Sequence, residues 1–346
     1  MYKLSFIIIL CLCADSYAQK SDFRHINLKK SDSIAKSCDI KNLYNLPLLV
    51  HKLTSQLDTD VEKFRAIHTW VCLNIESDHY FGDKTLRKRK KFKNDSLAFS
   101  IWNNQERSKM FKRLLKNQKT ICSGYAYLIK ELSNFAGIDC KVIDGYSRTT
   151  ERNVGKIDIP NHSWNAVLLN KKWYLVDATL ASGFFFVNEN KFIKRYNDGY
   201  FLADPDLFIK SHFPLEEKWI LVKDTPTLQQ FVSGPLVYGK TFENKVIPIE
   251  PKILVNKEYQ DESITFKYRF KDELDIENID FVVSYGNSFK SILPEGLVYE
   301  DGILEFTYQL SKKGRFDVHL KIDDDIVVSY NLEVKKRRNT MTISYN

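Results

Sequence analysis

The stretch NQKTICSGYAYLIKELSNFAG, residues 117–137, places Cys122 directly before a run with helical periodicity. Its apolar residues recur at the spacing of an amphipathic helix, and Gly137 follows where a left-handed residue ends many helices. A thiol at a helix N-terminus is either a buried structural side chain or a nucleophile whose thiolate the helix dipole stabilises. Whether the chain also supplies a base decides between these two interpretations.

The segment NHSWNAVLLNKKWYLVDATLASG, residues 161–183, supplies that base. It reads as two strands joined by a two-residue turn at residues 170–171. This register places Asp177 opposite Trp164, and residues two apart on a strand share a face, so His162 and Asp177 become diagonal neighbours. A carboxylate there would fix the tautomer of the imidazole and stabilise its protonated form, as acyl-transfer chemistry requires.

Taken singly, these residues are weak signals, because a buried cysteine or a strand histidine is more often structural. Their order along the chain is more specific, and it predicts Cys122 as nucleophile, His162 as base and Asp177 as the orienting acid. The free N–H groups at the helix start, including that of Cys122, would face a tetrahedral oxyanion. Gln118 is either a further donor to that oxyanion or an ordinary loop amide.

The organisation of the chain predicts an α+β domain followed by an all-β domain. A helix capped by Asp58 or Thr59 and ending near Asn74 comes first, and a helix over residues 97–115 follows a basic stretch. After the helix that begins at Cys122, the runs CKVIDGYS, HSWNAVLL, KWYLVDAT and FFFVN predict an antiparallel sheet. From about residue 225, short strand-like runs separated by turns predict a β-sandwich.

With these residues in place, residues 55–220 resemble a transglutaminase-like domain, a circularly related cousin of papain-type cysteine peptidases. The segments that carry the resemblance are VEKFRAIHTWVCLNIESD, CSGYAYLIKELSNFAGI, VIDGYSR and the strand pair around His162. The closing segment YFLADPDLFIKSHFPLEEKWILV resembles the branch related to kyphoscoliosis peptidase and cytokinesis-associated proteins, in which a β-rich domain follows. The resemblance implies the same roles for Cys122, His162 and Asp177. Where family members often have Gly-Val before the cysteine, this chain has Thr120-Ile121.

The predicted domains follow from these patterns and from the resemblance. They are a signal peptide at 1–18, a helical extension at 19–54, a transglutaminase-like catalytic domain at 55–222, an Ig-like β-sandwich at 225–338 and a tail at 339–346.

The first eighteen residues have the features of a secretory signal. Lys3 precedes a ten-residue apolar core, and Ser16 and Ala18 are small residues before Gln19. Ten apolar residues are about half of the roughly 20 that a spanning helix needs, so we predict cleavage after Ala18 and a secreted or periplasmic protein that is not transmembrane. Four cysteines would remain, too few and too scattered for a disulfide framework, although a single pair stays open.

The formal net charge is +8, and much of the excess lies in residues 84–94, which are rich in Lys and Arg. This segment is either a solvated loop or a site for an anionic cell-envelope polymer. Nucleic acid is not an expected partner, because no regularly spaced stacking aromatics accompany the basic residues. No cofactor or metal is expected, since the sequence contains no CxxC, HxxxH or HExxH.

Three interpretations of the function remain open at this stage. The first is a secreted thiol enzyme that forms a thioester at Cys122, acts on a protein or peptide substrate, and hydrolyses it in preference to cross-linking it. The second is a catalytically silent binding or scaffold module at the cell surface that keeps the triad, and a purely structural surface protein is a third interpretation. The sequence does not identify the substrate.

Overall fold

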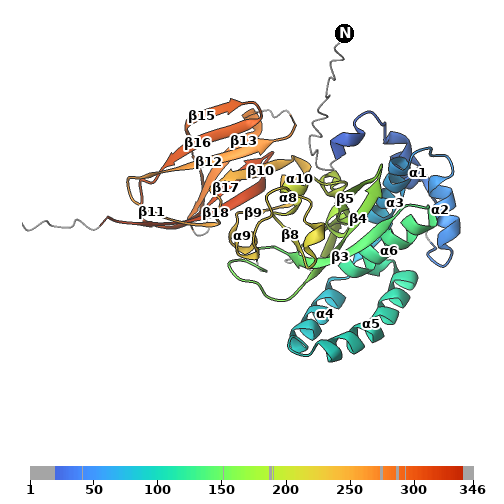
Figure 1. Ribbon diagram of the computed structural model, residues 1–346. Coiled ribbons are helices and arrows are strands. Elements are labelled where there is room, and N and C mark those ends of the chain that lie inside the picture. Colours follow the sequence, from blue (N-terminus) through green and yellow to red (C-terminus); the bar gives the residue numbers. More distant parts are fainter. Residues whose placement is uncertain are drawn as a thin grey trace, which may run out of the picture.

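The computed structural model of the protein describes residues 20–337, apart from 41, 151, 187–188, 190, 273–275, 286–287 and 293. The predicted signal peptide and tail therefore lie outside the described residues. The described part combines helices and a sheet in its N-terminal two thirds with β-sheets at the C-terminal end, as predicted (Figure 1). Each of these parts has its own large hydrophobic core. Among the described residues, no helix is long and apolar enough to cross a bilayer.

Three helices come first: α1 (Lys29–Ser37), α2 (Leu46–Thr54) and α3 (Asp60–Asn74). The predicted start of α3 is confirmed, because Thr59 caps it and forms a reciprocal capping box with Glu62. Ten of the fifteen residues of α3 are buried, so this helix is the central support of the domain.

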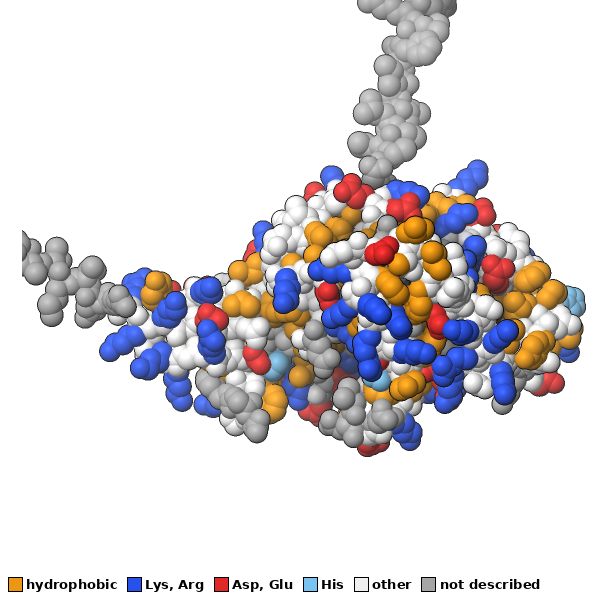
Figure 2. All heavy atoms as spheres, turned by 90° about the horizontal axis from the view of Figure 1, so that it is seen from below, with side chains coloured by type: hydrophobic (Ala, Val, Ile, Leu, Met, Phe, Trp, Pro, Cys, Tyr) orange, Lys and Arg blue, Asp and Glu red, His pale blue; other side chains and the backbone are white. Residues whose placement is uncertain are grey.

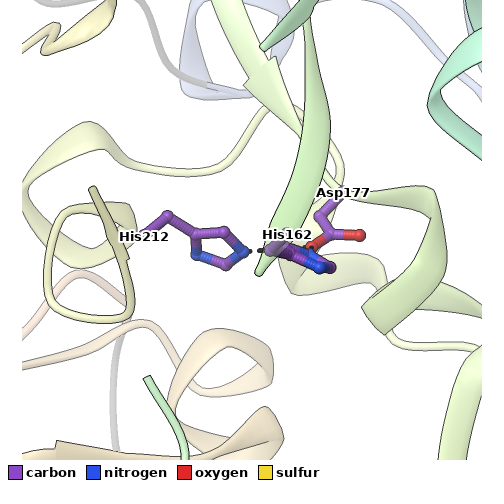
Figure 3. A group of neighbouring side chains, drawn as sticks. All are labelled: His162, Asp177 and His212. Carbon is purple, nitrogen blue, oxygen red and sulfur yellow. Dashed lines mark hydrogen bonds and ion pairs between the residues drawn. The ribbon is translucent and has the colours of Figure 1, made fainter. Parts of the chain in front are cut away.

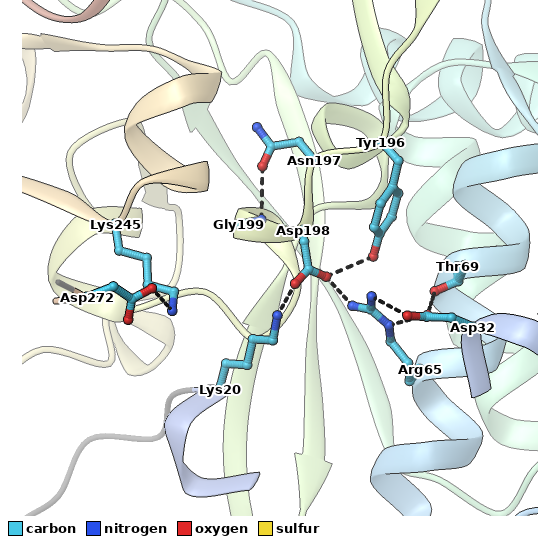
Figure 4. Close-up of polar contacts among 10 residues, drawn as sticks. All are labelled: Lys20, Asp32, Arg65, Thr69, Tyr196, Asn197, Asp198, Gly199, Lys245 and Asp272. Carbon is cyan, nitrogen blue, oxygen red and sulfur yellow. Dashed lines mark hydrogen bonds and ion pairs between the residues drawn. The ribbon is translucent and has the colours of Figure 1, made fainter. Parts of the chain in front are cut away.

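A polar network fixes α1 and a later loop to α3 (Figure 4). Arg65 on α3 forms a bidentate pair with Asp32 on α1, at 2.6 and 3.0 Å, and also pairs with Asp198. Asp198 accepts a further hydrogen bond from Tyr196 at 3.2 Å and pairs with Lys20. Because Arg65 is buried, these charge-assisted bonds compensate for its desolvation and hold the N-terminal helices in place.

The central sheet has four antiparallel strands in the order β5-β4-β3-β8. Their bounds are Lys172–Val176, His162–Leu169, Cys140–Ser147 and His212–Pro214 respectively. The predicted hairpin register is confirmed, since Leu169 pairs with Lys172 across the two-residue turn.

Helix α6 (Cys122–Phe135) packs on this sheet and against α3. Asn165 on β4 donates hydrogen bonds to the carbonyl oxygens of Ala126 on α6, at 2.9 Å, and of Lys141 on β3, at 3.1 Å. The buried amide fixes the register of the helix against the strand that begins at His162. Gly137 has φ +75° and ends the helix, as predicted.

Two predictions about this domain are wrong in detail. The basic segment 84–94 is not a loop, because most of it lies in helix α4 (His79–Lys91), which forms a helical hairpin with α5 (Ser96–Asn117). The run FFFVN does not join the central sheet; β6 (Gly183–Phe186) pairs with β7 (Lys191–Lys194) in a separate two-stranded sheet. The fourth strand of the central sheet, β8, was not predicted.

The hairpin of α4 and α5 projects from the body of the domain (Figure 1). Short parallel strands close its base, where β1 (Glu76–Ser77) pairs with β2 (Lys119–Thr120) immediately before Cys122. Salt bridges from Arg113 to Asp78, at 3.1 Å, and from Lys119 to Glu76, at 2.9 Å, lie at this base. The helical hairpin therefore stands directly beside the start of α6.

The C-terminal region contains two β-sheets, in agreement with the predicted sandwich. One has the order β10-β12-β16-β15, and the other has the order β11-β18-β17-β13-β14 with β9 paired to β18. The strands are β9 (Leu236–Val237), β10 (Val246–Glu250), β11 (Val255–Tyr259), β12 (Ser263–Phe270), β13 (Ile279–Tyr285), β14 (Ser288–Ser291), β15 (Glu295–Glu300), β16 (Ile303–Gln309), β17 (Gly314–Ile322) and β18 (Asp325–Lys335).

The remaining short helices are α7 (Ala178–Ser182) and α8 (Pro205–Phe208), which precede β8 in the chain, and α9 (Leu228–Ser233) and α10 (Gly239–Glu243), which follow it. The segment that links the two parts packs on the first core. Phe242 on α10 stacks on Tyr200, with ring centroids 4.2 Å apart, and Arg148 donates to the carbonyl oxygens of Gly234 and Pro235. The domain limit at residue 225 remains a prediction.

Candidate active site

Cys122 is the first residue of α6 and is partly exposed. Ile121 is the N-cap residue and provides no side-chain cap. No side-chain oxygen therefore caps the N–H groups of the first turn, although the Gly124 N–H donates to the carbonyl oxygen of Ile121 at 2.8 Å, and an uncapped helix start favours an anion at this position. The backbone N–H of Ser163 also donates to the Cys122 thiol.

His162 begins β4 and lies between the thiol and a carboxylate. Its Nε2–H donates to Asp177 Oδ2 at 2.6 Å, and its ring is hydrogen-bonded to Cys122. Since Nε2 is engaged by Asp177, Nδ1 is the nitrogen available to the thiol. The structure thus brings together all three residues that the sequence singled out.

Asp177 follows β5 directly and caps α7. Its Oδ1 accepts hydrogen bonds from the backbone N–H groups of Thr179, at 2.8 Å, and Leu180, at 3.0 Å. Its Oδ2 accepts from His162 and from a second histidine, His212, at 3.0 Å. Four hydrogen bonds hold this fully buried carboxylate, so its orientation toward His162 is fixed.

His212 is the residue that sequence reasoning missed (Figure 3). It lies on β8, opposite Ser147 of β3, and its ring stacks on Phe208 with centroids 3.9 Å apart. Its Nε2–H donates to Asp177, so its Nδ1 accepts from the hydroxyl of Ser211 at 2.8 Å. His212 is therefore a neutral donor that positions Asp177.

Gly145 allows β8 to approach the site. A Cβ atom there would lie 2.3 Å from the carbonyl oxygen of Phe213 and 2.4 Å from the Trp164 ring. Trp164 packs in turn against His212, with ring centroids 5.2 Å apart. Any side chain at position 145 would force β8 and Trp164 apart, and this would move His212 away from Asp177.

The electrostatics of the three residues support an ion pair. Burial opposes charge at all of them, but the Asp177 carboxylate raises the pKa of His162, and the hydrogen bond to Cys122 raises it further. Burial would likewise raise the pKa of Cys122, yet His162 and the charge of Arg89 lower it. The pKa of Asp177 is lowered, despite burial, by His162 and His212. The pKa shifts of Cys122 and His162 both favour the thiolate–imidazolium pair over the neutral thiol and imidazole.

His162, Asp177 and His212 also form a group whose potential ligand atoms lie within 4.8 Å of one another. Both histidines use Nε2 to donate to the same carboxylate oxygen, so these hydrogen bonds account for the close approach. A metal ion here would displace both of these bonds, beside a His212 ring that already packs against Trp164 and Phe208. The arrangement fits an oriented imidazole better than a metal site.

Two cavities meet at His162. The smaller, of about 160 Å³, is lined by Cys122, and the larger, of about 340 Å³, extends under the helical hairpin. Four residues line both cavities: Thr85, Arg89, Ile121 and His162. The thiol therefore opens into a groove that continues on both sides of the base.

The other sequence candidates lie elsewhere. Burial raises the pKa of Cys72 and that of Cys140, the latter to about 12, so both are unreactive thiols. No disulfide forms among Cys38, Cys72, Cys122 and Cys140. Gln118 ends α5 in the left-handed conformation, with φ 53°, and lines neither of the two cavities that meet at His162.

Comparison with known proteins agrees with this geometry. Residues 48–178 match the family model described as Transglutaminase-like superfamily, so the chain contains a domain of this superfamily.

The relatives belong to the branch that the sequence indicated. Kyphoscoliosis peptidase of Mus musculus is 34% identical over 222 residues, which cover 63% of this chain and 30% of that protein. Hillarin of Drosophila melanogaster is 29% identical over 232 residues, covering 63% of this chain and 26% of hillarin. Cytokinesis protein 3 of Saccharomyces cerevisiae is 31% identical over 133 residues, which cover 36% of this chain and 15% of that protein. The chain thus spans less than a third of the length of these relatives.

Proposed function

We propose that this chain is a thiol enzyme that transfers an acyl group through a thioester at Cys122 and hydrolyses peptide or amide bonds. The single observation that carries the proposal is the position of His162, which is hydrogen-bonded on one side to Cys122 and on the other to a fully buried Asp177. One similar protein is named a peptidase, and this name supports the choice of hydrolysis over cross-linking in the proposal.

The first half-reaction uses the ion pair directly. The Cys122 thiolate attacks the carbonyl carbon, and the oxyanion that forms faces the backbone N–H groups at the start of α6. The C–N bond then breaks, and the Nδ1–H of His162 donates its proton to the leaving amine. Asp177 holds the ring in position and stabilises its charged form before transfer.

The second half-reaction releases the acid. Water gives a proton to Nδ1 of the neutral His162 and attacks the thioester carbonyl, after which the thiolate leaves and the ion pair is restored. An amine in place of water would give cross-linking, which uses the same residues. The groove continues on both sides of His162 and leaves room for water beside the thioester, and this favours water as the acceptor.

The test uses denatured casein with a fluorescent primary amine, incubated with the wild type and with Cys122→Ala. Mass spectrometry would detect new peptide termini for hydrolysis and amine adducts for cross-linking. We expect new termini with the wild type alone. If neither product exceeds the Cys122→Ala background while Cys122 still alkylates readily, the scaffold function replaces this proposal.

We also propose that the protein is exported. The support is the charged start, ten-residue apolar core and small residues of 1–18, which form a cleavable signal. N-terminal sequencing of protein recovered outside the cytoplasm should give Gln19, whereas an intact Met1, or a lipid on Cys11 or Cys13, would contradict the proposal.

A further inference from the structure

Arg89 lies on α4 beside the thiol and has few partners for a charged side chain. One guanidinium N–H donates to the carbonyl oxygen of Pro160, at 3.3 Å. Its Nε atom is buried and has no hydrogen-bond partner among the described residues, and Arg89 forms none of the ion pairs found there. A buried donor without a partner is costly, so such a group in a groove indicates a missing acceptor.

The neighbouring cations differ from Arg89 in this respect. Lys90 pairs with Asp158 at 2.7 Å, and Arg152 pairs with Asp83 at 3.4 Å. Arg107 lies over the ring of Tyr127, 5.4 Å from its centroid. Among the described arginines that line the groove, Arg89 is thus the one whose planar guanidinium has neither a carboxylate nor an aromatic partner and remains available for an anion.

The carboxylates near the groove are already engaged. Glu106 pairs with Lys109 at 2.6 Å, and Asp144 accepts from the hydroxyl of Ser163 at 2.5 Å. Neither carboxylate neutralises Arg89 among the described contacts. The acceptor for Arg89 would therefore come from outside the chain.

The position of Arg89 connects it to the reaction. It lines both cavities together with His162, so a chain that crosses the thiol must pass its guanidinium. The larger cavity is otherwise rich in apolar and aromatic side chains, namely Phe81, Phe92, Trp102, Met110, Ile121 and Tyr127. This lining suits a large apolar side chain next to the anionic group.

We propose that Arg89 binds a carboxylate of the peptide substrate close to the scissile bond, with an apolar residue of the substrate in the larger cavity. The inference rests on the proposed function and names its substrate class. The carboxylate is either an acidic side chain or the C-terminal carboxyl group, because both offer the two oxygens that a guanidinium binds in bidentate fashion.

The surface around the groove favours the same substrates. Lys and Arg side chains gather on the face seen in Figure 2. Helix α4 contributes Lys84, Arg87, Lys88 and Lys91 besides Arg89 and Lys90. A positive field of this kind speeds the approach of acidic peptides at low ionic strength.

The first test compares alkylation of Cys122 by iodoacetate and by iodoacetamide, which differ in charge but not in the bond they form. The ratio of the two rates reports an anion-binding group at the thiol, and the neutral reagent corrects for any change in thiolate fraction. Arg89→Gln should lower the iodoacetate-to-iodoacetamide ratio about 10-fold, as expected for loss of a charge-assisted hydrogen bond. Arg89→Lys should give a ratio between those of the wild type and Arg89→Gln, because it keeps the positive charge.

Arg87→Gln is the matched control, because it makes the same change two residues away on the exposed side of α4 and lines neither cavity. It should leave the ratio within about 2-fold of the wild type, since long-range surface charge is screened by salt. Equal ratios in Arg89→Gln and the wild type would overturn the proposal. So would an equal loss in Arg89→Gln and Arg87→Gln.

The second test identifies the source of the carboxylate through protection of Cys122 from iodoacetamide. The probes are Ac-Phe-Glu-Ala-NH₂, Ac-Phe-Gln-Ala-OH and the neutral Ac-Phe-Gln-Ala-NH₂. Protection by the first alone assigns an acidic side chain, and protection by the second alone assigns a C-terminal carboxyl group, in each case lost in Arg89→Gln. Protection by inorganic polyphosphate alone would overturn the proposal and favour an anionic polymer on α4. No protection by any probe would also overturn it.

These outcomes are separable from failure of the proposed function. Alkylation needs the thiol and its surroundings but no turnover. A normal ratio effect with no peptide hydrolysis would leave Arg89 as a carboxylate site in a binding module, whereas hydrolysis without a ratio effect would leave the enzyme and remove the role of Arg89.

Discussion

Two cysteine–histidine pairs lie in the N-terminal part of the described chain, and their surroundings are opposite. On α3, the Cys72 thiol lies 3.8 Å from both ring nitrogens of His68, deep among aromatic side chains. At the start of α6, Cys122 meets His162 at the edge of a groove. Proximity of a thiol and an imidazole is therefore common to both sites.

The difference lies in what surrounds each pair. Burial, with the charge of Arg65, lowers the pKa of His68 to about 3, and burial raises the pKa of Cys72, so both groups stay neutral. At the other pair, a fully buried carboxylate reverses the effect of burial and stabilises the imidazolium. A carboxylate and an open groove, and not proximity, distinguish the reactive pair.

The largest expected effect comes from removing one thiol or the other. Cys122→Ala should abolish the release of peptides from casein, because no other group at the site can form the thioester. Cys72→Ala should leave turnover unchanged and lower the free energy of unfolding by about 1 kcal/mol, through a small cavity. Turnover by Cys122→Ala, or loss of turnover in Cys72→Ala, would show that Cys122 is not the reactive thiol of the two.

Removing the carboxylate should make the reactive pair resemble the silent one. Asp177→Asn should reduce turnover about 10² to 10⁴-fold, by analogy with the serine-protease triad, since the imidazole loses the charge that orients it. The control is Asp32→Asn, which breaks the bidentate pair with Arg65 away from the site. Asp32→Asn should lower the melting temperature but keep the kcat of the folded enzyme. If Asp177→Asn also lowered only the melting temperature and kept kcat, Asp177 would be a structural residue.

His212 should have an intermediate effect. His212→Phe keeps an aromatic ring against Phe208 but removes the donor to Asp177, and we expect kcat to fall about 10-fold, the cost of one charge-assisted bond. His212→Gln, which can still donate, should recover part of the loss. A purely structural His212 would lower the melting temperature in both variants while the pH profile of Cys122 alkylation stayed in place.

The smallest effect is expected at the silent pair. His68→Phe replaces a neutral buried ring with another among Phe64, Phe201 and Tyr196. Stability should change by about 1 kcal/mol, as for other overpacked core sites, with no change in kcat. A marked fall in kcat, with the fold intact by circular dichroism, would mean that this pair also contributes to the reaction.

The sequence predicted the parts of the site that depend on local rules. The capping box at Thr59, the helix start at Cys122 and the two-residue hairpin each follow from short-range patterns. The hairpin register places His162 beside Asp177. The sequence did not predict His212 as a site residue, because β8 has only three residues and joins the sheet through a long-range pairing with β3. No periodicity identifies so short a strand.

Of the two helices of the hairpin, the predicted helix over residues 97–115 is confirmed by α5, whereas α4 was missed for a different reason. Only Phe81 and Thr85 are buried in α4, so its sequence shows no apolar stripe, and its many Lys and Arg residues resemble a solvated loop. Good intrinsic helix formers and the Asp78 cap explain the helix in retrospect. The groove formed by this hairpin, and the place of Arg89 in it, could therefore come only from the structure.

The central claim is that an oriented imidazolium activates Cys122, and the most direct measurement is its rate of alkylation by iodoacetamide as a function of pH. Because the folded thiol has a lowered pKa, the wild type should react well below the ordinary thiol value of about 8.5. In His162→Ala the midpoint should rise toward that value, because the imidazolium no longer offsets burial and only Arg89, the backbone N–H of Ser163 and the helix N-terminus still favour the thiolate. The rate at pH 6 should then fall at least about 10-fold. If His162→Ala leaves the midpoint and the rate at pH 6 unmoved, no ion pair activates the thiol, and the account is contradicted.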